Sequence, residues 1–259
     1  MIRASREVTK EPSPNIFKMH THDFYEIFVF YTGDAYYHVE GMVYPLQAGD
    51  ILIMKRAEAH SLRINRIVPY DRAVIHFSAD MLPERQRAVL QDFLDQRPLG
   101  SFNRYPAALF PNTRWLSYVE KMYTHNQDPA YMQTYLTVLL TELWEAFPQV
   151  QAIRQQPSGQ ISDIITYINS NFCDSTLSIE TLCKHFFVSS TQLNRMFHQM
   201  TGVPVWKYVV TKRMLHAKQL LDSGKAPTDV CFQCGYHDYS PFFRAYKAHF
   251  GVSPAQHKK

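Results

Sequence analysis

The chain has 259 residues, of which 46% are hydrophobic, 14% aromatic and 19% charged. This composition supports a folded core and excludes disordered, collagen-like and coiled-coil chains. The formal charge of +4 is uneven: residues 160–259 carry 11 basic and 6 acidic side chains, and residues 1–159 carry 16 and 17. The basic excess favours a polyanionic partner for the C-terminal part alone.

No apolar run reaches the roughly 18 residues that a membrane span needs. The first ten residues lack the apolar stretch of a signal peptide, and four cysteines are too few for a secreted disulfide scaffold. We therefore expect a cytoplasmic protein with no membrane partner.

Short apolar segments separated by turns occupy residues 16–77 and predict a β-rich domain. A turn at Glu40-Gly41 joins two of these segments as a hairpin, and a turn at residues 47–50 precedes the next. Many short strands with turns between them are typical of a sandwich or a barrel. The expected strands cover residues 27–31, 36–39, 42–44, 51–54 and 74–77.

Helical periodicity begins at residue 113. Residues 113–147 predict two helices, the second of which starts after Asp128-Pro129, a typical helix N-terminus. Polar and structure-breaking residues between Pro148 and Gln160 predict a linker. Everything beyond Ile161 is helical in pattern.

The C-terminal hundred residues contain an internal repeat with an offset of 49 residues. Each copy has the features of one helix: a capping residue, an inward apolar face, and a glycine where the helix would end in a left-handed residue. The aligned pairs are Ser189 with Asp238, Leu193 with Phe242, Arg195 with Arg244, Phe197 with Tyr246, and Gly202 with Gly251.

A shorter helix is expected before each copy, at residues 179–186 and 227–234, and short turns at residues 187–188 and 235–237 separate the paired helices. Two helices joined by a short turn, with an exposed basic outer face, form a helix-turn-helix. The sequence therefore predicts two such motifs, joined by a long amphipathic segment at residues 205–221.

Residues 161–259 resemble the DNA-binding domain of AraC-type transcription regulators. The resemblance rests on Leu193-x-Arg-x-Phe197, Thr201-Gly202, Gly235-Tyr236, Phe242-Phe-Arg-x-Tyr-Lys247 and Gly251-Val-Ser-Pro254. The chain departs from the family pattern at Gly224, Pro227 and His257-Lys258, away from the expected recognition faces. The resemblance implies an activator that binds double-stranded DNA and acts with RNA polymerase. It also favours Cys183, Cys231 and Cys234 as small buried hydrophobic residues rather than half of a zinc site.

A homodimer is expected through the helices of residues 113–147, because they carry more apolar surface than one flank of a barrel needs; the alternative is that they only pack on the barrel. The side chains expected at this interface are Trp115, Tyr131, Tyr135, Leu139 and Trp144.

The first half of each recognition helix faces the bases in similar proteins. Arginine pairs naturally with guanine and asparagine with adenine, whereas lysine contacts to phosphate position the protein without specifying sequence. The alternative for each residue is a solvated helix face. The candidates are Ser190, Thr191, Asn194 and Arg195 in the first helix, Tyr239, Ser240, Phe243 and Arg244 in the second, and Lys207, Lys212 and Lys247 at phosphates.

A second constellation lies near the start of the β-rich domain. If residues 20–26 form a strand, alternation places His20, His22 and Glu26 on one face, and His60 follows a turn that returns it towards them. The pattern is similar to the three-histidine, one-glutamate site of metal-binding cupins, so a metal site remains the alternative. The AraC-type resemblance instead implies a sensor barrel that binds a small effector, expected to be a carbohydrate. Further pocket candidates are Tyr36, His38, Arg63, Arg72 and His76.

These observations predict an α+β chain with four parts. Residues 1–112 form a cupin-like effector-sensing barrel, residues 113–150 a helical dimerisation segment packed on it, residues 151–160 a linker, and residues 161–259 a double helix-turn-helix domain. The expected function is ligand-controlled transcription activation, with no enzymatic activity and no cofactor. A metal-dependent cupin enzyme and a ligand-independent DNA-binding protein are the alternatives.

Overall fold

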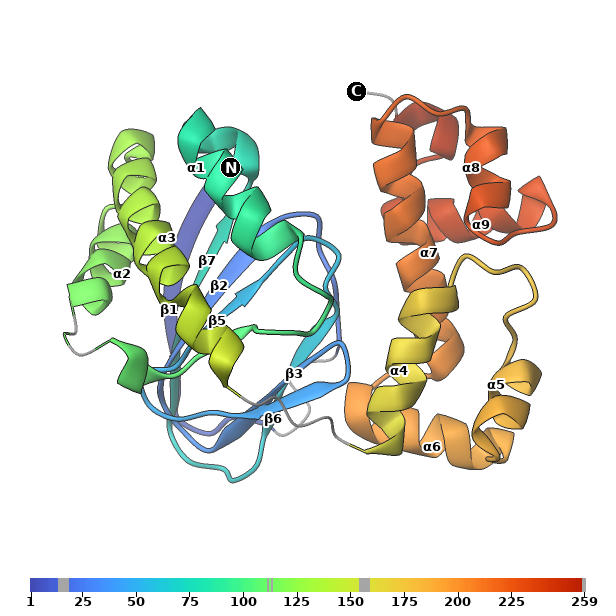
Figure 1. Ribbon diagram of the computed structural model, residues 1–259, viewed down its shortest axis with the longest axis horizontal. Coiled ribbons are helices and arrows are strands. Elements are labelled where there is room, and N and C mark those ends of the chain that lie inside the picture. Colours follow the sequence, from blue (N-terminus) through green and yellow to red (C-terminus); the bar gives the residue numbers. More distant parts are fainter. Residues whose placement is uncertain (14–18, 111, 113, 154–158, 258–259) are drawn as a thin grey trace. The chain divides into compact units, whose positions relative to one another are not determined.

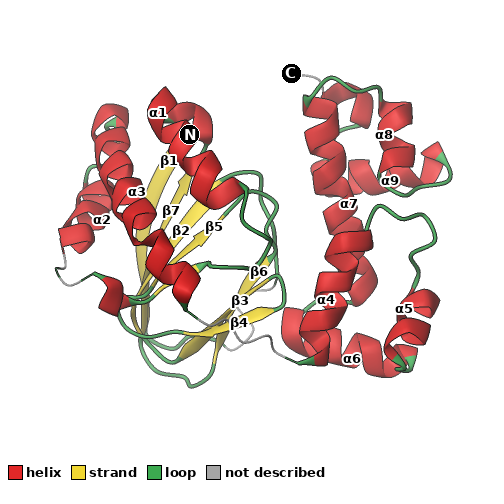
Figure 2. Ribbon diagram, in the orientation of Figure 1, coloured by secondary structure: helices red, strands yellow, loops and turns green. Residues whose placement is uncertain are grey.

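The computed structural model describes residues 1–259 except 14–18, 111, 113, 154–158 and 258–259 (Figure 1). The chain divides into two compact units, residues 1–157 and 158–259. The first is a cupin-like β structure flanked by helices and the second is all-helical, so the α+β class is confirmed (Figure 2). None of the described helices combines the length and the apolar content needed to cross a membrane.

The first unit contains two antiparallel sheets. The larger sheet has the strand order β1-β7-β2-β5-β8, and the smaller has the order β4-β3-β6. The strands are β1 (Ile2–Thr9), β2 (Tyr25–Thr32), β3 (Ala35–Val39), β4 (Met42–Pro45), β5 (Ile51–Met54), β6 (His60–Ile64), β7 (Tyr70–Phe77) and β8 (Arg104–Tyr105).

The central strand β2 of the larger sheet is buried on both faces. Successive side chains of a strand point in opposite directions, so its residues enter two different apolar clusters. Ile27 and Val29 of β2 belong to the apolar cluster that the sheet shares with the helices. Phe28 and Phe30 belong to a separate cluster with residues of the smaller sheet, including Tyr37 and Leu62. The space between the sheets is thus filled by large apolar side chains, and these four are at most 4% exposed.

Helices cover the outer face of the larger sheet (Figure 1). They are α1 (Glu84–Leu90), followed by a π-helical turn at Gln91–Asp95, α2 (Arg114–Thr124) and α3 (Pro129–Ala152). Asp128 caps α3 by accepting hydrogen bonds from the backbone N–H groups of Ala130 and Tyr131, at 3.0 and 3.1 Å.

The predicted helix end at Pro148 is wrong, because α3 continues through this residue to Ala152. A proline within a helix removes one backbone hydrogen bond. Pro148 is exposed, whereas Ala146 and Val150 on either side of it are buried in the core. Packing of the flanking turns therefore keeps the helix continuous. Of the expected linker, residues 154–158 lie outside the described part of the chain.

The structure adds strands that the sequence pattern did not reveal. Only Ala4 of β1 is buried, so this edge strand has no regular alternation of apolar residues. Strand β6 begins with His60 and Ser61, two polar residues that are both buried. Period-two reasoning finds half-buried strands with one apolar face, and neither segment has that pattern.

The second unit consists of helices (Figure 2). The predicted repeat is confirmed, because α6 and α9 each span 12 residues at an offset of 49 and end at Gly202 and Gly251, with φ of 74° and 76°. The helices are α4 (Gln160–Asn171), α5 (Ile179–Phe186), α6 (Ser190–Thr201), α7 (Val205–Asp222), α8 (Pro227–Gln233) and α9 (Tyr239–Phe250), followed by a 3-10 turn at Pro254–His257.

Helix α7 links the two helix-turn-helix motifs through a buried arginine. Arg213, 4% exposed, donates to the backbone oxygens of Phe172 (2.6 Å) and Asp174 (2.9 Å) in the connection from α4 to α5. Its guanidinium also lies 5.3 Å from the ring centre of Tyr236, which follows α8. A single side chain therefore contacts the connection that leads into the first motif and the turn of the second.

Candidate functional site

Helix α6 presents a polar outer face. Leu193 and Phe197 are fully buried, which fixes the rotation of the helix and leaves Arg195 exposed on the opposite side. Ser190 and Thr191 are also exposed, at the start of the helix. Ser189 caps the helix by accepting from the backbone N–H of Gln192 at 3.2 Å.

Asn194 is half-buried, and its side-chain amide donates to the backbone oxygen of Ser190 at 3.1 Å. A base contact by Asn194 would therefore have to replace this bond within its own helix.

Helix α9 repeats this arrangement with a more aromatic surface. Ser240, Arg244 and Lys247 are exposed, opposite the buried Phe242 and Tyr246. Tyr239 and Phe243 are half-buried and lie with their ring centres 6.2 Å apart. Tyr239 also lies 5.8 Å from the buried ring of Phe242, so its ring belongs in part to the core. Asp238 occupies the N-cap position without the side-chain capping bond that its residue type predicts.

One of the phosphate candidates is placed in the interior. Lys212 is 5% exposed, and its ammonium lies 5.9 Å from the ring centre of Tyr208 on the same helix. The prediction that Lys212 contacts phosphate is therefore wrong, because the side chain packs within the unit. Lys207, on the first turn of α7, is exposed.

The turns of the two motifs share one hydrogen-bond pattern. The backbone N–H of Val188 donates to the carbonyl oxygen of Cys183, and that of Tyr236 donates to the carbonyl oxygen of Cys231. The left-handed residue is Phe187 in the first turn (φ 55°, 95% exposed) and Gly235 in the second (φ 76°).

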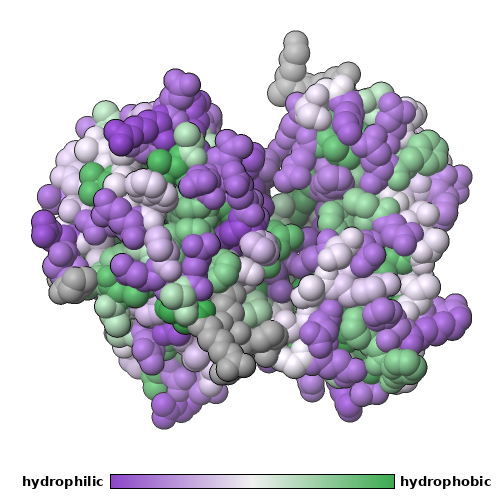
Figure 3. Space-filling model, viewed as in Figure 1, coloured by the Kyte–Doolittle hydropathy of each residue, from purple (hydrophilic) through white to green (hydrophobic). Residues whose placement is uncertain are grey.

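Figure 3 shows hydrophobic side chains dispersed among hydrophilic ones on the viewed face.

The cysteines of the second unit take the positions expected of small hydrophobic residues. Cys231 and Cys234 are fully buried in the apolar cluster around α7, and Cys183 is half-buried. Burial raises the pKa of the Cys234 thiol to about 12. This thiol is therefore protonated at neutral pH and a poor metal ligand or nucleophile.

In the first unit, His20, His22, Glu26 and His60 converge. Each offers one nitrogen or oxygen atom, and these atoms lie within 4.8 Å of one another. The backbones of His20 and His60 form an isolated bridge, with two hydrogen bonds of 3.0 Å. The expected strand over residues 20–26 is wrong, because β2 begins only at Tyr25. The bridge, rather than strand alternation, brings His20 to the others.

Glu26 is the centre of this histidine cluster, which we define as His20, His22, Glu26, His60 and His76. Its Oε2 lies 2.8 Å from His76 Nε2, 3.1 Å from His22 Nε2 and 3.7 Å from His60 Nε2. The Tyr37 hydroxyl donates to its other oxygen at 3.0 Å. Glu26 is 5% exposed, so the carboxylate is held in the interior almost entirely by these groups.

The electrostatics follow from this packing. Burial alone would raise the pKa of Glu26, but His60, together with hydrogen bonds from the neighbouring rings, holds it well below its ordinary value. Burial would lower the pKa of His60, but the Glu26 carboxylate raises it above the ordinary value. The cluster therefore favours an ionised carboxylate and a positive charge beside it.

The cluster is open on one side. His20 is exposed, and His22, Phe24 and His76 are half-buried. The ring of Phe24 stacks on that of His22, with centres 3.9 Å apart and planes within 5°, and lies 4.7 Å from His76. An aromatic wall thus adjoins the polar atoms at this end of the two sheets.

Two of the predicted pocket residues do not join the cluster. Tyr36 and His38 are on the face of β3 opposite Tyr37, and they pair across the smaller sheet with Arg63 and Ser61. Tyr36 is 37% exposed, and burial lowers the pKa of His38 to about 4, aided by the charge of Arg63. Their assignment to the Glu26 pocket is therefore wrong.

Tyr37, which contacts Glu26, was not predicted as a pocket residue. The run Tyr36-Tyr37-His38 consists of amphipathic residues only, so the sequence does not reveal which of them face inward. Of the other pocket candidates, Arg72 donates to Glu7 on β1 at 2.8 Å.

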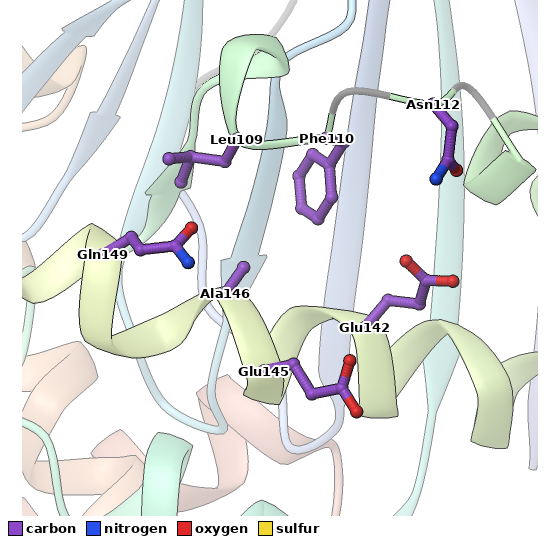
Figure 4. Close-up of a pocket in the computed structure, with 7 residues that line it drawn as sticks. All are labelled: Leu109, Phe110, Asn112, Glu142, Glu145, Ala146 and Gln149. Carbon is purple, nitrogen blue, oxygen red and sulfur yellow. The ribbon is translucent and has the colours of Figure 1, made fainter.

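A groove also lies on the outside of the first unit, beside α3 (Figure 4). Its volume of about 180 Å³ is below the roughly 300–1,000 Å³ typical of small-molecule sites. Glu142 and Glu145 flank it, and it is separate from the histidine cluster. Its lining residues are Leu109, Phe110, Asn112, Glu142, Glu145, Ala146 and Gln149.

Comparison with known proteins identifies both units. The AraC-like ligand binding domain matches residues 11–110, and a helix-turn-helix domain matches residues 182–259. The chain is 24% identical to the HTH-type transcriptional activator RhaS of Escherichia fergusonii, over 93% of this chain and 87% of that protein. It is 22% identical to the transcriptional activator RhaR of Cronobacter sakazakii, over 93% and 86%. Among solved structures, an apo form of ToxT from Vibrio cholerae matches with a TM-score of 0.46 and 14% identity, over 98% of this chain and 96% of that one.

Proposed function

Because the chain belongs to the AraC family of transcription regulators, we propose that its two units carry separate functions. The chain is a transcription activator with an N-terminal ligand-binding domain and not an enzyme. A carbohydrate effector binds at the histidine cluster of the first unit. The second unit binds a specific promoter through α6 and α9, and the protein acts there with RNA polymerase as a homodimer.

The observation that carries the DNA-binding proposal is the equivalence of α6 and α9. Both helices bury two large side chains one turn apart and direct an arginine, Arg195 or Arg244, to the outside. Each arginine can bind the O6 and N7 atoms of guanine with two hydrogen bonds. The exposed hydroxyl groups of Ser190, Thr191 and Ser240 supply hydrogen bonds to DNA from side chains shorter than arginine, and Lys207 and Lys247 supply phosphate contacts.

The carbohydrate proposal rests on the chemistry of the histidine cluster. Sugar hydroxyl groups both donate and accept hydrogen bonds, and the cluster offers a carboxylate and several imidazole nitrogens within a few ångströms. The half-buried ring of Phe24 supplies the apolar contact that sugar rings also favour. The apolar filling between the sheets leaves the open end, at His20 and Phe24, as the place for the ligand.

The dimer proposal keeps Tyr131 and Tyr135 of the predicted set and adds Val138; Trp144, also predicted, is 41% exposed on the same helix. Trp115 and Leu139, which the sequence suggested for an interface, are at most 2% exposed and belong to the core. Val138 is exposed on α3, and the half-buried Tyr135 and Tyr131 lie one and two turns before it. These three residues recur at helical spacing and form a stripe that a second copy can cover.

The test of DNA recognition uses the full chain and a selection of binding sites from random duplexes. Arg195→Ala should weaken binding to the selected site by about 1–3 kcal/mol and relax the preference at one base pair. His198→Ala, an exposed residue near the other end of the same helix, is the matched control and should bind as the wild type does. Equal behaviour of the two variants on all sequences would remove α6 from base recognition.

The test of the effector site is a thermal-shift screen against sugars and sugar phosphates, followed by calorimetric titration of the sugar that stabilises the protein. Glu26→Gln should weaken its binding roughly 10- to 100-fold, which corresponds to about 1–3 kcal/mol for one buried hydrogen-bond partner. Tyr36→Phe, on the opposite face of β3, is the control. Wild-type affinity of the Glu26 variant would place the effector elsewhere.

A further inference from the structure

The protonation of the histidine cluster is fixed in part by the backbone. His22 Nδ1 lies 2.9 Å from the carbonyl oxygen of Phe24, and His60 Nδ1 lies 2.8 Å from that of Glu58. A carbonyl oxygen only accepts hydrogen bonds, so each Nδ1 carries a proton and donates it. In a neutral ring, Nε2 then carries a lone pair.

Both lone pairs face a group that is itself an acceptor. His22 Nε2 and His60 Nε2 lie 3.1 and 3.7 Å from the same oxygen, Oε2 of Glu26. His60 is fully buried, and its Nε2 has no hydrogen-bond partner among the residues that the structure describes. Neutral rings would therefore leave lone pairs facing a buried carboxylate, so the arrangement needs either further protons on these rings or a metal cation between them and Glu26.

The spacing favours a metal ion over additional protons. A proton on His60 Nε2 would have to span 3.7 Å to Glu26, which is too long for a hydrogen bond. Two ligands at about 2.1 Å from a tetrahedral ion are about 3.4 Å apart, between the 3.1 and 3.7 Å observed. His20 brings a third imidazole within the same 4.8 Å group of atoms.

Surrounding groups hold these side chains in place as the outer contacts of metal sites do. The two carbonyl oxygens fix the rotation of His22 and His60, and Tyr37 fixes the second oxygen of Glu26. Three imidazoles and one carboxylate suit Zn²⁺, Fe²⁺, Mn²⁺ or Ni²⁺ rather than Ca²⁺ or Mg²⁺.

We propose that the first unit binds one divalent transition-metal ion through His20, His22, Glu26 and His60, with the exposed side of the site open to an oxygen atom of the effector. The role given to the effector rests on the proposed function. Metal binding itself rests only on the geometry of the four side chains.

The test uses the full chain, purified without a histidine tag and stripped with a chelator. Calorimetry with Zn²⁺ and visible absorption with Co²⁺ should each give one equivalent per chain. His22→Ala and His60→Ala should weaken binding at least about 100-fold, and Tyr37→Phe about 10-fold. His125→Ala, an exposed histidine after α2, is the matched control and should bind as the wild type does.

Because His60 is fully buried, His60→Ala can fail to fold. His20 is exposed, so His20→Ala keeps the test decisive with a folded protein. Binding of less than one equivalent by the wild type, or wild-type affinity in both His20→Ala and His22→Ala, would overturn the metal site.

The same samples separate the two proposals. If metal does not bind but a sugar still stabilises the stripped protein, the metal site is wrong and the effector proposal stands. If one equivalent binds but no sugar stabilises the loaded protein, the metal site stands and the carbohydrate proposal is wrong.

Discussion

Gly235 lies in the turn of the second helix-turn-helix, where two separate constraints act on one residue. Its φ of 76° is a left-handed conformation, which costs a residue with a side chain about 1–2 kcal/mol. A Cβ atom there would also lie 2.7 Å from the backbone oxygen of Cys173 and 3.0 Å from the guanidinium of Arg213. Relieving such an overlap by moving backbone costs typically about 1–3 kcal/mol more. Gly235→Ala should therefore destabilise the second unit by about 2–5 kcal/mol.

Gly251 provides the matched control. It has the same φ of 76°, but a Cβ atom there would meet no described atom within 4 Å. Gly251→Ala should therefore lose only the conformational part, about 1–2 kcal/mol. The measurement is urea unfolding of both full-length variants, followed by circular dichroism at 222 nm, with DNA affinity measured in parallel. Equal losses in the two variants would refute the argument that the contact with Cys173 and Arg213 constrains this turn.

Three further predictions concern the surface, the charge and the pH response. Val138→Glu should give a folded monomer, whereas Leu139→Ala should lower stability by about 2–5 kcal/mol through a core cavity. Sedimentation measures the first effect and thermal unfolding the second. A wild-type protein that sediments as a monomer at tens of micromolar would exclude the interface. Lys247→Ala should weaken binding to all duplexes alike and reduce the salt slope by about one, and a sequence-dependent loss would contradict a phosphate contact. The pKa of His38 is about 4 in the folded protein, below the unfolded value of 6.5. Its contribution to the free energy of unfolding is therefore complete above pH 6.5. It declines by at most about 3 kcal/mol as the pH falls towards 4, because the unfolded chain takes up the proton first. Urea midpoints between pH 4 and 7 should show this slope, and His38→Gln should reduce it.

The second unit was predictable from sequence because its signals are local. A capping residue, an apolar face and a terminal glycine each act within one helix, and the second copy 49 residues later repeats them. The rotation of α6 and α9 follows directly from Leu193 and Phe242. Lys212 was assigned wrongly because α7 lies at the centre of the unit and buries more than one of its faces.

The first unit was less predictable because its contacts are distant in sequence. His20 meets His60 through a backbone bridge across 40 residues, which no periodicity encodes. Strand alternation shows that Tyr36 and His38 share a face, but not that Tyr37 is the residue facing Glu26. Leu139 was taken for a surface residue because α3 is largely apolar along its 24 residues and offers no clear polar side.

In the DNA complex proposed above, helix α7 and Arg213 determine how the contacts of α6 and α9 combine. With both recognition helices on one continuous scaffold, binding of α6 holds α9 near its own half of the site at an effective concentration on the order of millimolar or above. Two individually weak contacts then give one avid interaction, and it depends on the spacing between the two halves of the site. Inserting a few base pairs between them would remove the second contact entirely. Loosening Arg213 from the backbone oxygens of Phe172 and Asp174 would erode the same avidity without changing any residue that meets DNA.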